Sequence, residues 1–227
     1  MVSDQLSTLG RILGSEPEPG QFHPGGHYDD PELPESSPTI GYRLNHFMLR
    51  IRDPQKTLHF YIDLMGMRTV FTMNTGPFTI YYLGFPRTEA DRADLKQWSR
   101  STASFETIVQ TPGLLELKHI HGSERSAEQG GYEISNGNTA PALGFGHLGF
   151  TVPDVQATVA RLRAAGVTVV KELGYSGRDS IPLTEWEKGR GVGTEEMVDS
   201  YKKTLEKVAC VIDPNGYIVE LVPQRLN

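Results

Sequence analysis

Apolar residues follow two different periods along the chain, one typical of helices and one typical of strands. Residues 54–65 place Leu58, Tyr61, Ile62 and Met65 three and four positions apart, which is the pattern of a helix with one buried face. Short alternating or continuous apolar stretches on either side predict strands. This part of the chain is therefore predicted to form strand, helix and three strands, over residues 43–51, 54–65, 67–74, 78–85 and 113–120.

The same order of elements returns later in the chain. Strand, helix and three strands are predicted over residues 146–152, 154–165, 167–172, 206–212 and 217–222. Each half has a histidine on its first strand, His46 or His147, and a glutamate on its last strand, Glu116 or Glu220. The two residues are 70 positions apart in the first half (46 to 116) and 73 in the second (147 to 220). This repetition predicts an α+β fold of tandem βαβββ modules.

Residues 1–40 precede the repeat and differ from it in composition. Residues 3–14 carry leucines at helical spacing, which predicts a short helix. Residues 15–39 are rich in proline, glycine and acidic side chains, which is typical of an extended arm or a disordered segment.

The repeat sets the remaining boundaries. We expect the first module over residues 41–121, a linker over residues 122–142 and the second module over residues 143–227. Two insertions interrupt the modules: a polar, helical stretch near 87–108 and a longer one at about 173–205.

Composition narrows the class of protein without indicating its chemistry. With 37% hydrophobic residues, 22% charged residues and a net charge of −6, the chain is typical of soluble globular proteins. Acidic residues outnumber the 22 basic ones, and the basic residues form no stripe, so we expect no nucleic-acid partner. No apolar run approaches the roughly 20 residues that span a bilayer, so we expect no membrane association. The single cysteine, Cys210, lies in an apolar stretch, which favours a buried residue in a reducing, cytoplasmic setting over a nucleophile.

Strand geometry makes the repeated histidines and glutamates a candidate site. Side chains alternate between the two faces of a strand, so residues two apart share a face. On strand 43–51, His46 shares its face with Met48 and Arg50, whereas Asn45 and Phe47 are expected on the other face. By the same rule, Glu116, His147 and Glu220 are expected to point away from the apolar side of the strands, which the helices cover. Two halves joined edge to edge are therefore expected to bring all four together.

The four side chains suit a divalent metal ion. Two imidazoles and two carboxylates are ligands that borderline metals accept, and the two negative charges balance a charge of +2. Because no thiolate takes part, a catalytic site with room for water or substrate oxygens is favoured over a closed structural zinc site. A single strand histidine or glutamate is usually structural or solvated, but four at equivalent positions of a repeat indicate a site.

Two other signals carry less weight. The sequence G-x-G-x-x-G at 144–149 leads into a strand, whereas a nucleotide-binding fingerprint follows a strand and opens a helix. His119 is expected to face the helix side, so His119 and His121 are expected to pack rather than to bind metal.

Four segments of the repeat resemble glyoxalase I, the lactoylglutathione lyase family of the vicinal oxygen chelate superfamily. They are NHFMLRIRDP (45–54), GLLELKH (113–119), GFGHLGFTVPD (144–154) and DPNGYIVEL (213–221), and the resemblance covers about residues 41–224. It implies a mixed curved sheet, a homodimer with the site at the subunit interface, and the metal ligands His46, Glu116, His147 and Glu220. The first-half insertion and the N-terminal arm resemble the zinc-type enzymes, so Zn²⁺ is the expected ion, with Ni²⁺, Co²⁺, Mn²⁺ and Fe²⁺ as alternatives.

The resemblance also implies a reaction. The family isomerises the hemithioacetal of methylglyoxal and glutathione to S-lactoylglutathione through a metal-stabilised enediolate. Glu220 is implied as the main base that moves a proton between adjacent carbons, with Glu116 as a second catalytic carboxylate on the opposite face of the substrate. Arg50 and Lys171 match family residues that bind substrate, and we expect Met48 to contact the substrate from the same face as His46.

Two positions depart from the family pattern and keep other functions open. Ile120 stands where the family has an asparagine, and Leu143 stands where it has an arginine. A hydrogen bond to a charged group contributes about 1.5–3 kcal/mol, so the loss of these two polar partners should weaken the binding of glutathione. The alternative is therefore a metalloenzyme of the same fold that acts on a glutathione-free, less polar substrate. A non-catalytic small-molecule binding protein is another alternative, although it would have no use for four ligands. The last alternative is an iron-dependent ring-cleaving dioxygenase. Such enzymes bind iron through two histidines and one carboxylate, so Glu116 would not be needed as a ligand.

Overall fold

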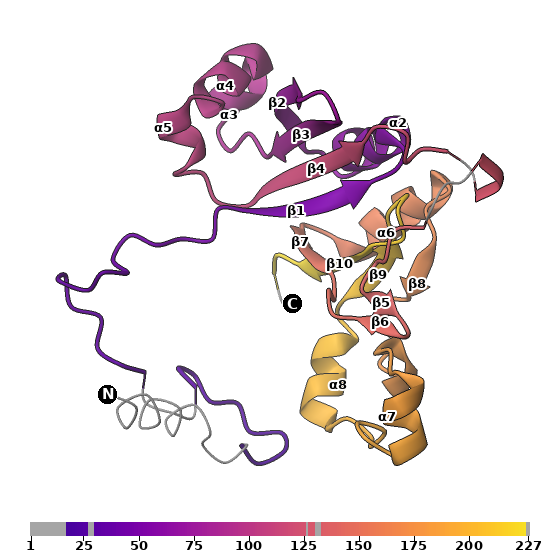
Figure 1. The fold of residues 1–227 in the computed structure, drawn as a ribbon. Coiled ribbons are helices and arrows are strands. Elements are labelled where there is room, and N and C mark those ends of the chain that lie inside the picture. Colours follow the sequence, from indigo (N-terminus) through magenta and orange to yellow (C-terminus); the bar gives the residue numbers. More distant parts are fainter. Residues whose placement is uncertain (1–16, 27–29, 126, 130–132, 226–227) are drawn as a thin grey trace, which may run out of the picture.

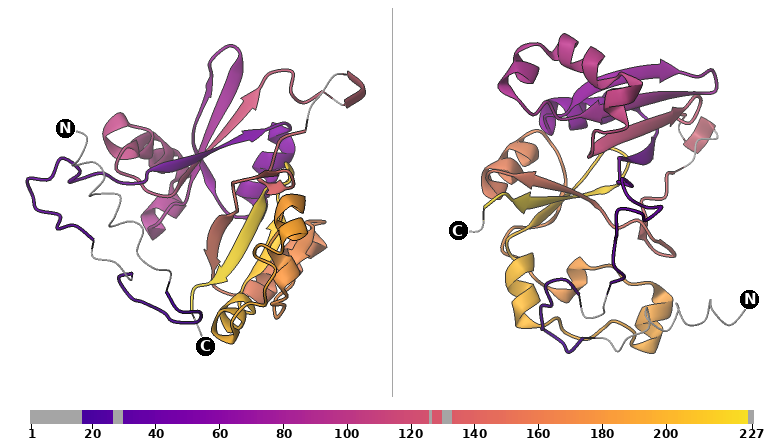
Figure 2. Two further views of the ribbon diagram at one scale, coloured as in Figure 1. Left: turned by 60° about the horizontal axis from the view of Figure 1, so that its bottom comes forward. Right: turned by 90° about the vertical axis from the view of Figure 1, so that its left-hand side faces the viewer.

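The computed structural model of the protein describes residues 17–26, 30–125, 127–129 and 133–225. The helix expected over 3–14 lies outside these residues. Where it is described, the expected arm contains turns and extended segments but no helix or strand. Figures 1 and 2 show this segment running outside both halves of the protein toward the start of helix α8 (Asp199–Leu205).

The first half contains a four-stranded mixed sheet in the order β1-β4-β3-β2, in which β1 and β4 are parallel. Asp53 caps the helix after β1, because its side chain accepts a hydrogen bond from the backbone N–H of Lys56, and Pro54 supplies a backbone angle suited to the first turn. The elements are β1 (His46–Ile51), α2 (Pro54–Leu58) continued by the π-helix η1 (His59–Leu64), β2 (Arg68–Asn74), β3 (Phe78–Gly84) and β4 (Leu114–Ile120).

The second half repeats this arrangement. Its sheet has the order β7-β10-β9-β8, and β7 and β10 are parallel. Asp154 caps α6 as Asp53 caps α2, by accepting a hydrogen bond from the N–H of Ala157. The shared order and the shared cap confirm the predicted repeat of βαβββ modules. The elements are β7 (Leu148–Val152), α6 (Val155–Ala164), β8 (Val169–Lys171), β9 (Ala209–Ile212) and β10 (Ile218–Pro223).

Both insertions contain helices. The first holds α3 (Glu89–Ala93), α4 (Leu95–Thr102) and α5 (Phe105–Ile108), and the second holds the 3-10 turn η3 (Arg178–Ser180), α7 (Glu185–Arg190) and α8. The linker contains the 3-10 turn η2 (Ala127–Gln129) and a hairpin of β5 (Asn138–Thr139) and β6 (Ala142–Leu143). The hairpin was not predicted, because a two-residue strand has too few positions to show alternation. No helix in the described part of the chain is long and apolar enough to cross a membrane.

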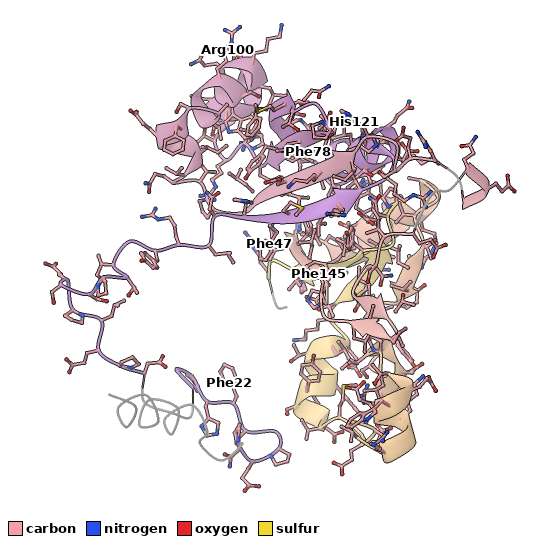
Figure 3. The ribbon with its side chains drawn as sticks, in the orientation of Figure 1. Phe22, Phe47, Phe78, Arg100, His121 and Phe145 are labelled. Carbon is pink, nitrogen blue, oxygen red and sulfur yellow. The ribbon has the colours of Figure 1, made fainter. Side chains whose placement is uncertain are left out.

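The two halves share one hydrophobic core. Leu49 and Leu117 of the first half are buried in the same cluster as Val219 and Leu221 of the second. Figure 1 shows the two halves stacked on each other, and Figure 3 shows Phe47 at the side of the first half that faces the second. One face of each sheet is therefore used to hold the halves together.

The turn between β9 and β10 adds polar contacts between the halves. The buried hydroxyl of Tyr61 donates to Asp213 at 3.1 Å, and Asn215 accepts a hydrogen bond from the backbone N–H of Arg52 at 2.9 Å. Burial raises the pKa of Tyr61 and that of Asp213. These contacts fix the turn of the second half against the first helix of the first half.

Candidate metal centre

His46 and Glu116 meet on the face of the first sheet opposite the shared core. His46 begins β1, and the parallel register places Glu116 of β4 beside Met48 of β1. His46 Nε2 lies 3.6 Å from Glu116 Oε2. Because Leu49 and Leu117 point into the core, strand alternation leaves this pair on the other face, as predicted.

Glu116 has two further partners. Tyr82 of β3 lies opposite it in antiparallel register, and the Tyr82 hydroxyl hydrogen-bonds to the carboxylate. Burial, reinforced by this carboxylate, raises the pKa of Tyr82 to about 12, so the hydroxyl keeps its proton and donates at neutral pH. Lys118 Nζ lies 3.6 Å from Glu116 Oε1. The carboxylate of this buried glutamate is thus held from several sides.

His147 and Glu220 form the equivalent pair in the second half. His147 directly precedes β7, and its Nε2 lies 3.4 Å from Glu220 Oε2 on β10. The Glu220 side chain is 23% exposed, compared with 11% for the Glu116 side chain. Among the residues that the structure describes, Glu220 forms an ion pair with His147 alone. The second carboxylate is therefore the less restrained of the two.

A cavity of about 340 Å³ lies beside the second pair. His147 and Glu220 line one part of it. The second insertion and the β5–β6 hairpin supply most of the rest, and the apolar or aromatic side chains among the lining residues are Leu143, Ile181, Pro182, Tyr201, Leu205 and Ile218. The second insertion thus forms a wall of the cavity.

The four candidate ligands do not form one group within a single chain. In the described residues, no three His, Cys, Asp or Glu side chains lie close enough together to hold a metal ion. The halves of one chain pack through the core faces of their sheets, and each His–Glu pair lies on the face opposite that core. The expectation that the two halves of one chain join edge to edge and bring all four together is therefore wrong for one chain.

Each pair nevertheless fits two corners of a metal site. Ligand atoms about 2.1 Å from one ion, at angles of about 90–110°, lie roughly 3.0–3.4 Å apart. The separations of 3.6 Å in the first pair and 3.4 Å in the second are close to this range. Imidazole nitrogen and carboxylate oxygen are also the donors that a borderline divalent ion accepts. The donor atoms of each pair therefore fit two of the four positions around one such ion.

The residues expected to bind substrate are placed differently from one another. Arg50 and Met48 are exposed on β1, on the face that carries His46. Lys171 is only 4% exposed, and its Nζ donates to the backbone carbonyls of Leu205 at 2.7 Å and Val208 at 2.8 Å. Lys171 therefore ties the end of α8 to β8. It also lines the cavity, and its expected contact with substrate stays a prediction.

We expect Lys171→Met to lower the free energy of unfolding by about 1–3 kcal/mol, because it leaves two buried carbonyls without their donor. Urea unfolding of the full chain measures this change. Lys188→Met is the matched control: Lys188 is exposed and pairs with Glu185 at the surface of α7, so the change should stay below about 1 kcal/mol. Unchanged stability in Lys171→Met, together with a raised KM, would instead identify Lys171 as a substrate ligand.

Cys210 lies between Lys171 and Glu220 in the strand register of the second sheet. Its side chain is partly buried, and this burial, reinforced by the Glu220 carboxylate, raises the pKa of the thiol to about 11. The thiol is therefore protonated at neutral pH. This agrees with the prediction that Cys210 is a strand residue rather than a nucleophile.

The two weaker sequence signals have structural explanations. His119 Nε2 lies 3.0 Å from Glu124 Oε2, and His121 Nε2 lies 2.9 Å from Thr79 Oγ1. Each of these histidines therefore has a polar partner within the chain. The glycine-rich stretch 144–149 leads from β6 into β7 and opens no helix, so it lacks the context of a nucleotide-binding loop.

Three residues that contact the first pair were not predicted as site residues. Lys118 could have been predicted from the sequence, because it lies two positions from Glu116 on one strand and so shares its face. Tyr82 was not, because its place depends on the register between β3 and β4. Asn45 was expected only to share no face with His46; it directly precedes the strand, and its Oδ1 lies 2.8 Å from His46 Nδ1.

Comparison with known proteins shows to which family the chain belongs. The family described as the Glyoxalase/Bleomycin resistance protein/Dioxygenase superfamily matches residues 43–221. The chain belongs to this superfamily. A lactoylglutathione lyase from Pseudomonas aeruginosa is 33% identical to the chain, over 83% of the chain and 86% of the relative. Glyoxalase I from Saccharomyces cerevisiae is 28% identical, over 84% of the chain and 47% of the yeast protein.

These relatives define the chain more narrowly as an enzyme of the glyoxalase I type. Among solved structures, glyoxalase I from Zea mays matches with a TM-score of 0.47 and 19% identity, over 82% of this chain and 45% of the maize chain. Leishmania major glyoxalase I matches with a TM-score of 0.46 and 19% identity, over 81% of this chain and 88% of that one. At this distance the solved structures support no argument about the site, so the assignment depends on the sequence relatives.

Proposed function

We propose that the chain is a metal-dependent lactoylglutathione lyase, which converts the hemithioacetal of methylglyoxal and glutathione to S-lactoylglutathione. The observation that supports this most is the pair of His–Glu sets, His46 with Glu116 and His147 with Glu220, at equivalent places of two modules. Relatives at 28–33% identity that are named lactoylglutathione lyase or glyoxalase I support the same reaction.

The proposed ligands of the ion are His46, Glu116, His147 and Glu220, and the proposed ion is Zn²⁺. A divalent ion bound there would polarise the substrate oxygens and stabilise negative charge on them. Because the pairs of one chain lie apart, we propose that the first pair of one copy and the second pair of another copy complete each site. A twofold homodimer then contains two equivalent sites.

Glu220 is the proposed base. The reaction takes a proton from the carbon bonded to sulfur and returns one to the neighbouring carbon, which a single positioned carboxylate can do in both steps. Glu220 suits this role because it lines the cavity and pairs only with His147 among the described residues. Glu116 is held by Tyr82 and Lys118, and we propose that it acts on the opposite face of the substrate.

A less polar, glutathione-free substrate is the second candidate. Leu143 lines the cavity beside Glu220, together with Ile181 and Leu205 of the second insertion. Ile120 ends β4. Apolar side chains at these places bind the charged ends of a tripeptide poorly, although the exposed guanidinium of Arg50 remains available to a carboxylate.

Metal analysis of the purified protein, followed by the hemithioacetal isomerase assay, tests the proposal. We expect equimolar divalent metal, turnover that a chelator removes, and recovery when Zn²⁺ is added back. Metal-bound protein that does not turn over the glutathione adduct would contradict the proposed substrate and favour the second candidate. Protein that binds a small ligand tightly but holds no metal would favour a binding protein instead.

A further inference from the structure

The two proposed metal-binding histidines are held in different ways. His46 follows Asn45, whose Oδ1 lies 2.8 Å from His46 Nδ1. His147 occupies the equivalent place in the second half but follows Gly146, which has no side chain. In the described part of the chain, the only side-chain bond or ion pair of the His147 ring is that to Glu220. The first histidine therefore has a support that the second does not have.

The chain behind Asn45 fixes the orientation of its amide. Asn45 Nδ2 lies 2.8 Å from the backbone oxygen of Ile108 and 2.8 Å from that of Thr111. A carbonyl oxygen only accepts hydrogen bonds, so the end of the amide that faces these two oxygens must be the NH₂ group. The other end, Oδ1, then faces His46.

This orientation determines which nitrogen of His46 carries the hydrogen. Because Asn45 Oδ1 can only accept, the hydrogen must be on Nδ1 of the imidazole. A neutral imidazole with its hydrogen on Nδ1 has its free lone pair on Nε2, and a histidine binds metal through such a lone pair. Nε2 is also the atom that lies 3.6 Å from Glu116 Oε2. The lone pair thus lies on the side of the ring where the other half of the ligand pair is found.

We propose that Asn45 is a positioning residue that selects the Nδ1-protonated tautomer of His46 and so prepares Nε2 to bind the metal ion. This rests on the proposed function only in taking His46 as a ligand. The two carbonyls that orient Asn45 belong to α5 and the turn after it. The first insertion, which contributes no proposed ligand, therefore acts on the metal site through this amide. Residues that orient a ligand in this way typically change metal affinity by about 10–100-fold when they are mutated.

Two measurements on the full chain test the proposal. Long-range ¹H–¹⁵N NMR of the metal-free protein identifies the tautomer of each histidine ring, and Zn²⁺ affinity is measured by competition with a chelator. In Asn45→Ala we expect the hydrogen of His46 to move to Nε2, where Glu116 accepts it, and the affinity for Zn²⁺ to fall about 10–100-fold. The tautomer of His147 should not change.

Two control variants separate this role from simple loosening of α5. Ser104→Ala removes the N-cap of α5, because Ser104 Oγ accepts a hydrogen bond from Thr107 N, but touches neither Asn45 nor His46. We expect it to keep both the tautomer and the affinity. Asn45→Asp loses the bonds to the two carbonyls but keeps an oxygen for His46 Nδ1, so it should retain the Nδ1 tautomer even if Asn45→Ala does not fold.

The outcomes that overturn the proposal are distinct. They are an unchanged His46 tautomer in Asn45→Ala, a changed tautomer in Ser104→Ala, or loss of the Nδ1 tautomer in Asn45→Asp. The tautomer is read without metal and without substrate, so this result does not depend on whether the chain turns over the hemithioacetal.

Discussion

Replacing Glu220 by glutamine should lower kcat by about 10²–10⁴-fold and leave the fold intact, because glutamine has the shape of glutamate but cannot take up the proton. Glu220 lies beside a cavity with its side chain 23% exposed, so the loss of its charge leaves no deeply buried group without a partner. The hemithioacetal isomerase assay measures kcat, and thermal unfolding monitored by circular dichroism checks the fold.

Glu220 is also a proposed metal ligand, so its two roles must be separated. The assay is therefore repeated at saturating Zn²⁺ with the metal content measured in parallel. If activity returns once the metal is bound, Glu220 is a ligand and another group is the base. Glu172→Gln is the matched control, because Glu172 pairs with Arg163 at the surface and should keep full activity.

Mixing two inactive variants should restore about a quarter of the wild-type activity. One variant carries His46→Ala and Glu116→Ala, and the other carries His147→Ala and Glu220→Ala. If each site combines the first pair of one copy with the second pair of another, neither variant alone has an intact site. After random exchange of subunits, half of the dimers are mixed, and each mixed dimer has one intact site and one that lacks all four ligands.

The measurement is activity after partial unfolding and refolding of the equimolar mixture, with each variant refolded alone as the control. Sedimentation or light scattering shows whether dimers form. No recovery of activity in mixed dimers would contradict the shared site. Full activity in either variant alone would show that the altered pair is not required.

The repeat and the faces on which its four candidate residues lie were predictable from sequence because they depend on local rules. Strand alternation and the near-equal spacing from histidine to glutamate place His46 and Glu116, and likewise His147 and Glu220, on the faces opposite the core. The helix N-cap at Asp53 is also a local feature, since a cap involves only the next few residues. Features of this kind need no knowledge of how distant segments meet.

The rest depends on contacts between distant segments. The sequence did not indicate that Leu117 and Val219 would share one core, and this sharing is what separates the two pairs within one chain. Nor did it indicate that Lys171 would reach the carbonyls of Leu205 and Val208, because that bond requires the insertion to fold back onto β8. The hydrogen bond from His46 to Asn45 was not predicted either, because alternation along a strand says nothing about contacts between neighbouring side chains where the strand begins.

The second insertion forms a wall of the cavity, and this affects how such an enzyme changes in evolution. The proposed ligands lie on or beside sheet strands, whereas Ile181, Pro182 and Tyr201 lie in or beside the short helices of the insertion. Rigid elements and surface loops accept sequence change at different rates, since a loop tolerates substitutions and length changes that a strand does not. A descendant of this chain can therefore acquire a new substrate range by changes in the insertion alone, while it inherits the reaction unchanged.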